Sequence, residues 1–346
     1  MDTGLSNPTI LLIGNFLSSA IGMRHVSEDL AEHLIAAGWK VITVSEKPGK
    51  LERTIDMAST VWSRRHSYDI AHVEVYSGLA FGWAELVCRM LYMMGKPFLI
   101  SLHGGNLPEF ARKWPGRVGW VLNHAMVVTT PSRYLLERLS HIRKDIALIP
   151  NPINLGAYEY RKRSVLSPSL AWLRSFHNIY NPSLAARVIA IIKPDHPDIK
   201  LTMIGPDKKD GSLDQFRQVA AELGVTSNIV ITGSVSKDKI SDHLNTADIF
   251  INTTNFDNAP VSVMEAMACG LCIVSTNVGG LPFLLEHEGD ALLVPKDDPE
   301  AMASAIRRLL DDPQLAAALS ENAYIKSRQW DWAAVLPQWE ALFRMK

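Results

Sequence analysis

The stretch that decides the fold reads NFDNAPVSVMEAMACGLCIVSTNVGG and covers residues 255–280. Its first part carries Asp257 and Glu265 on either side of an expected helix start. Its last part is an apolar strand that ends in Gly279 and Gly280. A strand, loop, helix and second strand in this order are typical of a parallel sheet covered by helices. We expect the two glycines to let the backbone approach a ligand closely.

The helix of this unit is expected to begin near Ala259 and Pro260. Proline suits the first turn of a helix because its missing N–H would be unpaired there. The N–H groups of Val261 and Ser262 then lie at the positive end of the helix dipole, where phosphate groups and sugar hydroxyls bind. Asp257 has two open roles, since its carboxylate can cap the helix or reach a ligand.

Strand and helix patterns alternate along the rest of the chain, which predicts α/β architecture with parallel sheets. Residues 150–169 interrupt this pattern with three prolines, a glycine and the basic run 161–163, which we expect to be solvated. We therefore place the crossing between two domains there, with domain ranges 1–155 and 156–330, and expect a ligand in the cleft between them. Two helices are expected to close the chain. The expected strands are 9–13, 40–44, 69–75, 97–102, 125–129, 146–149, 170–174, 200–204, 228–232, 248–252, 272–275 and 291–294.

Composition excludes several classes of protein. The 346 residues include 47% apolar and 21% charged residues, enough for two packed cores. The net charge of −1 argues against binding nucleic acid by charge alone. The first ten residues lack a basic region, and no window is typical of a membrane span, so we expect a cytoplasmic protein. Cys269 and Cys272 lie in an apolar passage and are expected to be small core residues.

The spacing within 255–280 is similar to a known signature. It runs through an acid, seven residues, a glutamate, an Ala-Met-Ala-x-Gly segment (266–270), an apolar strand and a glycine pair. This pattern resembles the retaining nucleotide-sugar glycosyltransferases of glycosyltransferase family 4. The similarity continues through DALLVPKDDPEAMASAIRRLLDD, residues 290–312. The resemblance implies the GT-B fold: two Rossmann-like domains facing a cleft, with a C-terminal helix, about 331–346, crossing back to the N-terminal domain.

The resemblance also implies roles for residues of the second domain. Glu265 would hold the ribose hydroxyls of the donor, although by itself it could be a solvated helical glutamate. Asp257, or its neighbour Asn258, would contact the transferred sugar. Arg174 would grip the donor diphosphate, because a planar cation binds phosphate bidentately; the alternative is a surface ion pair. The nucleotide base would lie near Gly233.

This chain departs from the family pattern in three places. The first acid is Asp257 where a glutamate is common. The lysine that usually follows the arginine by one turn is absent from residues 179–181, and Arg24 and Arg187 are candidates to replace it. A Gly-Gly pair expected near the first helix is reduced to Gly22, whose ordinary role would be a plain helix entry.

One histidine of the first domain is also a candidate. His103 follows a buried strand and is backed by two glycines. By resemblance it would lie beside the donor sugar, where it could donate a hydrogen bond or orient the acceptor. The ordinary alternative is a core histidine whose hydrogen bonds are satisfied.

These features predict a metal-independent, retaining glycosyltransferase without a cofactor. Its donor would be a UDP- or GDP-linked sugar, and its acceptor a glycan, a lipid-linked sugar or a small molecule. Two alternatives stay open: a GT-B nucleotide-sugar epimerase and a non-catalytic GT-B-like subunit that binds nucleotide or glycan. Clustered basic residues in the first domain could also dock the protein at the inner membrane surface.

Overall fold

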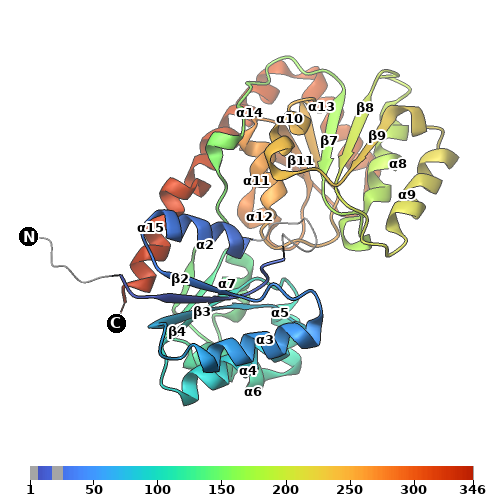
Figure 1. Cartoon of the computed structure of the whole chain (residues 1–346). Coiled ribbons are helices and arrows are strands. Elements are labelled where there is room, and N and C mark those ends of the chain that lie inside the picture. Colours follow the sequence, from blue (N-terminus) through green and yellow to red (C-terminus); the bar gives the residue numbers. More distant parts are fainter. Residues whose placement is uncertain (1–6, 18–25, 346) are drawn as a thin grey trace, which may run out of the picture. The chain divides into compact units, whose positions relative to one another are not determined.

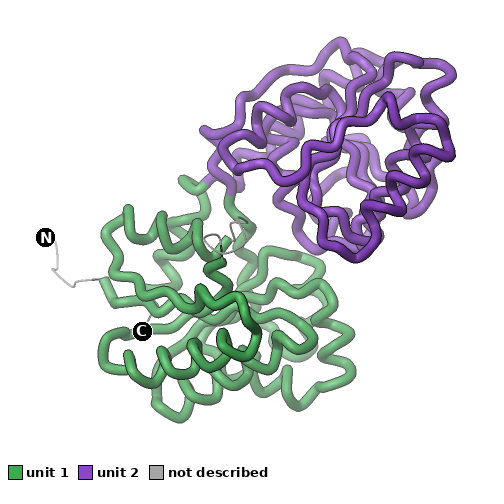
Figure 2. The backbone as a smooth tube through the Cα atoms, turned by 45° about the vertical axis from the view of Figure 1, so that its right-hand side comes forward, with its two compact units in different colours: residues 1–152, 332–346 green, residues 153–331 purple. Residues whose placement is uncertain are grey.

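The computed structural model describes residues 7–17 and 26–345. The chain divides into two compact units, which Figure 2 distinguishes by colour. Unit 1 comprises residues 1–152 and 332–346, and unit 2 comprises residues 153–331. The expected domain ranges met at residues 155 and 156, and the structure divides the chain between residues 152 and 153. Each unit is one parallel sheet with helices on both faces (Figure 1).

Unit 1 contains a parallel sheet with the strand order β2-β1-β3-β4-β5-β6. The central strand β1 is buried along its whole length, as the continuous apolar run predicted. Alternate residues of this strand enter different cores, because side chains of a strand point to opposite faces. The strands are β1 (Ile10–Ile13), β2 (Val41–Val44), β3 (Ile70–Val75), β4 (Phe98–Leu102), β5 (Val127–Thr130) and β6 (Ile146–Leu148).

The helices of unit 1 cover the two faces unequally. The larger core lies between the sheet and the helices α3 to α7. The smaller core lies between the sheet and two helices far apart in sequence, α2 and α15. These helices are α2 (Val26–Ala36), α3 (Lys50–Ser63), α4 (Leu79–Met93), α5 (Leu107–Lys113), α6 (Pro115–His124), α7 (Arg133–Leu139) and α15 (Trp332–Phe343).

The C-terminal helix α15 belongs to unit 1, which confirms the expected return of the chain to the N-terminal domain. Its buried face carries Trp332 and Trp339. The Trp332 ring stacks on His33 of α2 with 3.9 Å between ring centroids. Three helices follow the last strand of the chain rather than the two expected, because α13 (Pro299–Asp311) and α14 (Pro313–Ser327) precede α15.

Unit 2 repeats the architecture with the strand order β12-β11-β10-β7-β8-β9. One face of its sheet packs against α8, α9 and α13, and the other packs against α10, α11 and α12. All twelve expected strands are found in the described part of the chain, with ends that differ by at most two residues. The elements are β7 (Ser169–Leu173), β8 (Lys200–Ile204), β9 (Ile229–Gly233), β10 (Ile249–Asn252), β11 (Cys272–Thr276), β12 (Ala291–Val294), α8 (Pro182–Ile192), α9 (Ser212–Glu222), α10 (Ile240–Leu244), α11 (Val261–Ala268) and α12 (Leu281–Leu284).

Each sheet has one point at which the chain reverses its direction of travel across the sheet. In unit 1 this switch point lies between β1 and β3, and in unit 2 it lies between β7 and β10. Loops leaving the carboxyl ends of two such strands turn to opposite faces, which opens a crevice. The switch points are therefore the two places where the fold favours a ligand.

Two residues of the basic run 161–163 are exposed as the sequence predicted, with 52% of the Arg161 and 54% of the Lys162 side chain accessible, but the third is not. The side chain of Arg163 is buried, and it donates to the carbonyl oxygens of Ala247 and Cys269 and to Asn245 Oδ1. Asp248 Oδ1 lies 3.7 Å from Arg163 Nε, so the buried charge is compensated. A helix long and apolar enough to traverse a bilayer is absent from the described residues.

Candidate functional site

Arg174 and Asp257 meet at the switch point of unit 2. Arg174 directly follows β7, and its Nη2 donates to Asp257 Oδ2 in the loop after β10. Only 16% and 15% of the two side chains are exposed. The guanidinium carbon lies 5.0 Å from the centroid of the Tyr180 ring. The Arg174 Nε–H is buried and has no acceptor among the described residues, so part of this cation's hydrogen-bonding capacity is unused.

The backbone of Arg174 is positioned by a glycine that the sequence analysis did not single out. Gly205 directly follows β8 with φ +144°, and a Cβ there would overlap the Arg174 carbonyl oxygen. The Arg174 N–H donates to the Ile204 carbonyl at 3.0 Å, so the two strand ends lie directly side by side. A glycine immediately after a predicted strand, followed by Pro206, was the available signal.

Two loops are tied together around the Arg174–Asp257 pair. Thr253 Oγ1 donates to the Tyr180 carbonyl at 2.7 Å, and the Asn255 N–H donates to the Ile179 carbonyl at 2.7 Å. These bonds hold the turn that replaces the family's lysine against the loop that carries Asp257. Tyr180 thus contributes an aromatic face to the guanidinium where the family has a second cation.

Of the two arginines suggested as substitutes for the missing lysine, the structure describes Arg187, whose contacts lie elsewhere. Arg187 of α8 forms an ion pair with Asp297 at 3.7 Å, and 44% of its side chain is exposed. Arg24 lies outside the described residues, as does the candidate Gly22.

The start of α11 lies beside Asp257, but Asp257 does not cap the helix. Pro260 occupies the capping position without a side-chain hydrogen bond, one residue earlier than its expected place in the first turn. The carboxylate instead accepts from Arg174 and, through Oδ1, from the Asn258 N–H at 2.7 Å. Ala259 and Pro260 precede α11, and the first N–H groups of this helix, including that of Val261, have no acceptor within the helix.

The hydroxyl of Ser262 adds a buried polar group at this helix start. The residue is 6% exposed, and within the described ranges its Oγ has no hydrogen-bond partner. A buried hydroxyl without a partner carries a desolvation cost that a ligand oxygen can relieve. Ser262 Oγ and Arg174 Nε are thus two independent groups in unit 2 that lack a protein partner.

Glu265 is not the solvated helical glutamate of the ordinary alternative. It is 7% exposed, and the Tyr158 hydroxyl donates to its Oε1 at 2.6 Å. Tyr158 comes from the segment that links the two units, and the sequence analysis did not identify it. A buried carboxylate one turn into a helix, oriented by a tyrosine, can accept hydrogen bonds from ligand hydroxyls.

The glycine pair supports the loop that carries Asp257. A Cβ on Gly279, whose φ is +56°, would overlap the Asp257 carbonyl, and a Cβ on Gly280 would overlap the Asn258 carbonyl. The Gly280 N–H donates to the Asp257 carbonyl at 2.8 Å. The glycines therefore let their backbone pack against residues 257 and 258, which supports the acid; their approach to a ligand stays a prediction.

Gly233 lies at the end of β9, at the same edge of the sheet. Its φ is +72°, and a Cβ there would meet nothing within 4 Å. Its carbonyl accepts from the Gly205 N–H at 2.9 Å, which places it next to the glycine that supports Arg174. The position is open enough for a planar base to approach the backbone.

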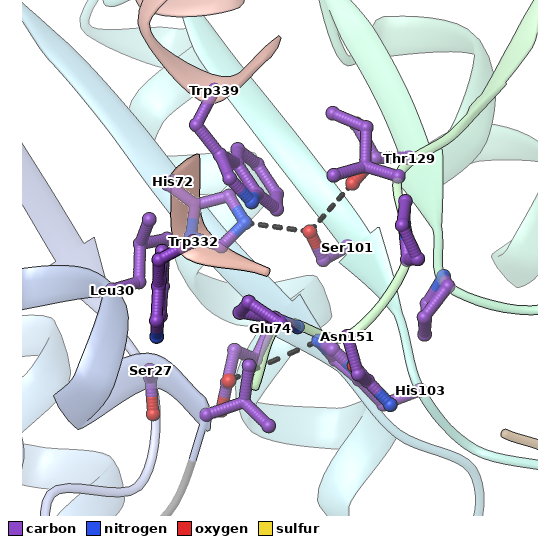
Figure 3. A pocket seen from close by; sticks show the side chains of 15 residues that line it. Ser27, Leu30, His72, Glu74, Ser101, His103, Thr129, Asn151, Trp332 and Trp339 are labelled. Carbon is purple, nitrogen blue, oxygen red and sulfur yellow. Dashed lines mark hydrogen bonds and ion pairs between the residues drawn. The ribbon is translucent and has the colours of Figure 1, made fainter. Parts of the chain in front are cut away.

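His103 lies in unit 1, directly after β4, and lines a pocket shown in Figure 3. Its Nε2 is 3.8 Å from Glu74 Oε1, and its ring stacks on Tyr76 with 5.5 Å between centroids. Burial lowers the pKa of His103 to about 4, so the imidazole is neutral at pH 7. A neutral imidazole can donate one hydrogen bond and accept another.

Glu74 is the acid that the sequence analysis missed. It lies at the end of β3, at the switch point of unit 1, and is 3% exposed. Its Oε2 accepts from the Tyr76 hydroxyl at 3.2 Å and weakly from the Asn15 N–H at 3.4 Å. Burial raises the pKa of Glu74 to about 7. A Cβ on Gly14 would lie 2.5 Å from the same oxygen, so this glycine leaves room for the carboxyl group.

Three hydrogen-bonded polar side chains lie above Glu74 in the same pocket (Figure 3). His72 Nε2 and Ser101 Oγ are 2.7 Å apart, and Ser101 Oγ and Thr129 Oγ1 are 2.6 Å apart. Burial lowers the pKa of His72 to about 3. His72 and Glu74 occupy alternate positions of a strand that is otherwise apolar, and this alternation was the missed sequence signal.

Comparisons with known proteins agree with this architecture. Residues 170–326 match the family model for glycosyl transferases group 1, and residues 53–157 match the model for glycosyltransferase family 4. A D-inositol 3-phosphate glycosyltransferase of Corynebacterium glutamicum is 29% identical, over 92% of this chain and 82% of that protein. The enzyme of the same name from Thermobispora bispora is 24% identical, over 88% of this chain and 77% of that protein.

Solved structures show the same fold. The sucrose-phosphate synthase of Thermosynechococcus elongatus superposes with a TM-score of 0.81 at 20% identity, covering 97% of this chain and 98% of its own. The Anabaena protein HepE, solved in complex with UDP and glucose, superposes with a TM-score of 0.78 at 16% identity. The match covers 98% of this chain and 100% of the HepE chain. The two family models together match most of the chain, with one in each unit. The chain therefore belongs to the GT-B glycosyltransferases of family 4, the glycosyl transferases group 1, and is a glycosyltransferase.

Proposed function

We propose that this glycosyltransferase takes its sugar from a UDP- or GDP-linked donor bound by unit 2. The observation that carries the proposal is the cation at the switch point of that unit's sheet. Arg174 has an unused buried N–H there, beside the start of α11 and the buried hydroxyl of Ser262. A nucleoside diphosphate is the ligand that such a combination of guanidinium, hydroxyl and helix N-terminus favours. The HepE structures with UDP and with UDP-glucose support the same donor class.

In this proposal the donor is bound by residues of unit 2. Arg174 and the α11 start bind the diphosphate, and Glu265 accepts hydrogen bonds from the ribose hydroxyls. Asp257, now paired with Arg174, turns one oxygen to the transferred sugar while the diphosphate takes its place on the guanidinium. The base lies against the open backbone at Gly233. The positive charge of Arg174 stabilises the departing diphosphate, so no metal ion is required.

We further propose that the transfer retains the anomeric configuration. The acceptor oxygen forms a bond to the anomeric carbon on the face from which the diphosphate leaves. The bond between that carbon and the phosphate oxygen breaks, and the acceptor proton passes to the departing phosphate oxygen. Retention by a double displacement needs two carboxyl groups flanking the bond, and this proposal brings one, Asp257, to the sugar. Unit 1 binds the acceptor, a glycan, a lipid-linked sugar or a small molecule, and His103 contacts it.

The test is a panel of UDP- and GDP-linked sugars combined with several acceptors. Release of nucleoside diphosphate that depends on the acceptor is expected for one donor, with an unchanged rate in EDTA. NMR of the product is expected to show the anomer of the donor. Conversion of one nucleotide sugar into another, without an acceptor, would favour the epimerase alternative. Nucleotide binding without turnover across the whole panel would favour the non-catalytic alternative.

A peripheral membrane contact is part of the same proposal for lipid-linked acceptors. Helix α3 exposes Leu51, Ile55 and Trp62 along one stripe, by 74%, 60% and 57%. Arg65 stacks on Trp62 with 4.6 Å between its guanidinium carbon and the ring, which combines a cation with an interfacial aromatic side chain. Co-sedimentation with vesicles rich in phosphatidylglycerol, lost in Trp62→Asp, is the expected result. Equal sedimentation of the variant would exclude this face.

A further inference from the structure

The switch point of unit 1 carries a buried acid instead of a cation. Glu74 lies where β3 ends beside β1, and its carboxyl group is held by Tyr76 and by the Asn15 backbone. Its Oε1 faces His103 at 3.8 Å. The carboxyl group is therefore fixed by neighbours on one side while its other oxygen faces the histidine in the pocket (Figure 3).

The pocket above Glu74 is small, and its described lining carries no positive charge. Its cavity volume is about 20 Å³, which is enough for one water-sized group such as a hydroxyl. Its polar walls come from Ser27, His72, Ser101, Thr129 and Asn151, and no lysine or arginine is among the described residues that line it. A phosphate group has five heavy atoms and two negative charges, so it fits neither the size nor the charge of this pocket.

We propose that Glu74 determines the specificity of the acceptor: the pocket takes one uncharged hydroxyl, which donates to Glu74 beside His103, and it excludes a phosphate-bearing group. The inference rests on the proposed function, in which unit 1 binds the acceptor. It predicts an acceptor without phosphate, although relatives at 24% and 29% identity are named D-inositol 3-phosphate glycosyltransferases. Its acceptor presents a neutral sugar or polyol hydroxyl to this point.

Charge reinforces the exclusion as the pH rises. Glu74 has a pKa of about 7, so its negative charge develops near neutrality. Among the described residues, the titratable groups that face it are Tyr76, His103 and Glu28, and none of these is a cation at pH 7 to 9. Two negative charges about 6 Å apart at an effective dielectric constant near 20 repel by a few kcal/mol, so roughly tenfold or stronger discrimination is expected.

The experiment measures binding of matched ligands by ligand-observed NMR with UDP present. The pairs are myo-inositol with D-inositol 3-phosphate, and glucose with glucose 6-sulfate, whose charge is constant over the pH range used. Wild type is expected to bind the neutral member of each pair at least about tenfold more tightly at pH 8. Glu74→Gln is expected to reduce that ratio at least fivefold and to weaken the neutral ligand.

The matched control is Glu85→Gln, which removes a buried glutamate of the same unit that is bonded to Arg89 and Arg117 away from the pocket. It is expected to keep the wild-type ratio. A measurement on wild type alone covers the case in which Glu74→Gln does not fold. The glucose to glucose 6-sulfate ratio is expected to rise severalfold between pH 6 and pH 8.5.

Three results would overturn the inference. These are tighter binding of the charged member by wild type, a ratio unchanged by Glu74→Gln or by pH, and no binding of any ligand of the panel. The proposed donor site is judged separately, from UDP affinity and its dependence on Arg174. If wild type binds UDP but does not prefer the uncharged member of each ligand pair, only the inference about Glu74 is wrong. Absence of UDP binding would contradict the proposed function itself.

Discussion

Unit 1 and unit 2 each have six parallel strands, and in each the chain reverses its direction beside the first central strand. At that point unit 2 carries Arg174, a guanidinium with an unused buried N–H. Unit 1 carries Glu74, a buried carboxyl group with a raised pKa. The two loops that meet there are joined by side-chain contacts in both units. The same topology therefore presents a cation in one unit and an acid in the other.

This difference shows what each level of structure contributes. The parallel sheet decides where a crevice opens, because loops from neighbouring strand ends separate only at a switch point. The side chain placed there decides which ligand is favoured, since a guanidinium attracts a diphosphate and an ionised carboxylate repels it. Glycines next to the charged residue make both placements possible, Gly205 for Arg174 and Gly14 for Glu74.

The largest expected effect concerns the packing of the loop that carries Asp257, at the switch point of unit 2. In Gly280→Ala the new Cβ overlaps the Asn258 carbonyl, which is backbone and gives way only if the loop moves. We expect a loss of roughly 3 kcal/mol or more in the free energy of unfolding. Denaturant unfolding followed by circular dichroism measures it. Gly156→Ala, whose Cβ would make an ordinary contact at 3.6 Å, is the control and is expected to change stability by less than about 0.5 kcal/mol.

The next effect tests the cation itself. Arg174→Ala removes a charge-assisted contact worth about 2–3 kcal/mol, so UDP affinity is expected to fall about 100-fold in calorimetric titration. Arg307→Ala removes an arginine of the same unit that pairs with Asp195 at 2.7 Å, and is expected to leave UDP affinity unchanged. Equal affinity of Arg174→Ala and wild type would remove the contrast between the two switch points.

A pH experiment tests the acid of unit 1. Burial raises the pKa of Glu74 from 4.5 to about 7, so the folded state holds a proton that the unfolded state has lost. Its contribution to stability is therefore complete below pH 4.5 and is lost as the pH rises through 7. Because the lowered pKa values of His72 and His103 add stability as the pH rises, the Glu74 contribution is taken as the difference between two curves. Between pH 5 and 8, wild type is expected to lose on the order of 2 kcal/mol of unfolding free energy in urea relative to Glu74→Gln.

Glu85→Gln is again the control for that slope. It is expected to lower the free energy of unfolding, because Arg117 and Arg89 lose their partner, while the shape of the curve between pH 5 and 8 stays that of wild type. Parallel stability curves of wild type and Glu74→Gln over this interval would contradict the burial of an unionised carboxyl group in unit 1.

The smallest effect concerns the residue found in place of the family's lysine. Tyr180 offers its ring to Arg174 at 5.0 Å, a contact worth about 0.5–1 kcal/mol. Tyr180→Ala is expected to weaken UDP binding about three- to fivefold, whereas Tyr180→Phe, which keeps the ring, is expected to bind as wild type does. A drop of the same size in Tyr180→Phe would show that the hydroxyl, not the ring, matters.

Part of the candidate site was predictable from local sequence. The alternation of apolar and polar runs predicted every strand described here. The predicted strand ends in turn placed Arg174, His103 and Asp257 in loops at the carboxyl ends of strands. Partners distant in sequence were not predictable in this way. Tyr158 reaches Glu265 over 107 positions, and Asn15 reaches Glu74 over 59 positions. No local pattern reports such contacts.

By itself, the sequence determined two parallel α/β units and the family to which the chain belongs, because strand periodicity and motif spacing are local properties of the chain. Only the tertiary structure decided what the motif residues touch. Asp257 pairs with Arg174 rather than capping α11, the glycine pair supports residues 257 and 258, and Glu74 joins His103 in one pocket. These outcomes depend on which strands become neighbours, and hydrogen bonding across the sheet settles that only when the chain has folded.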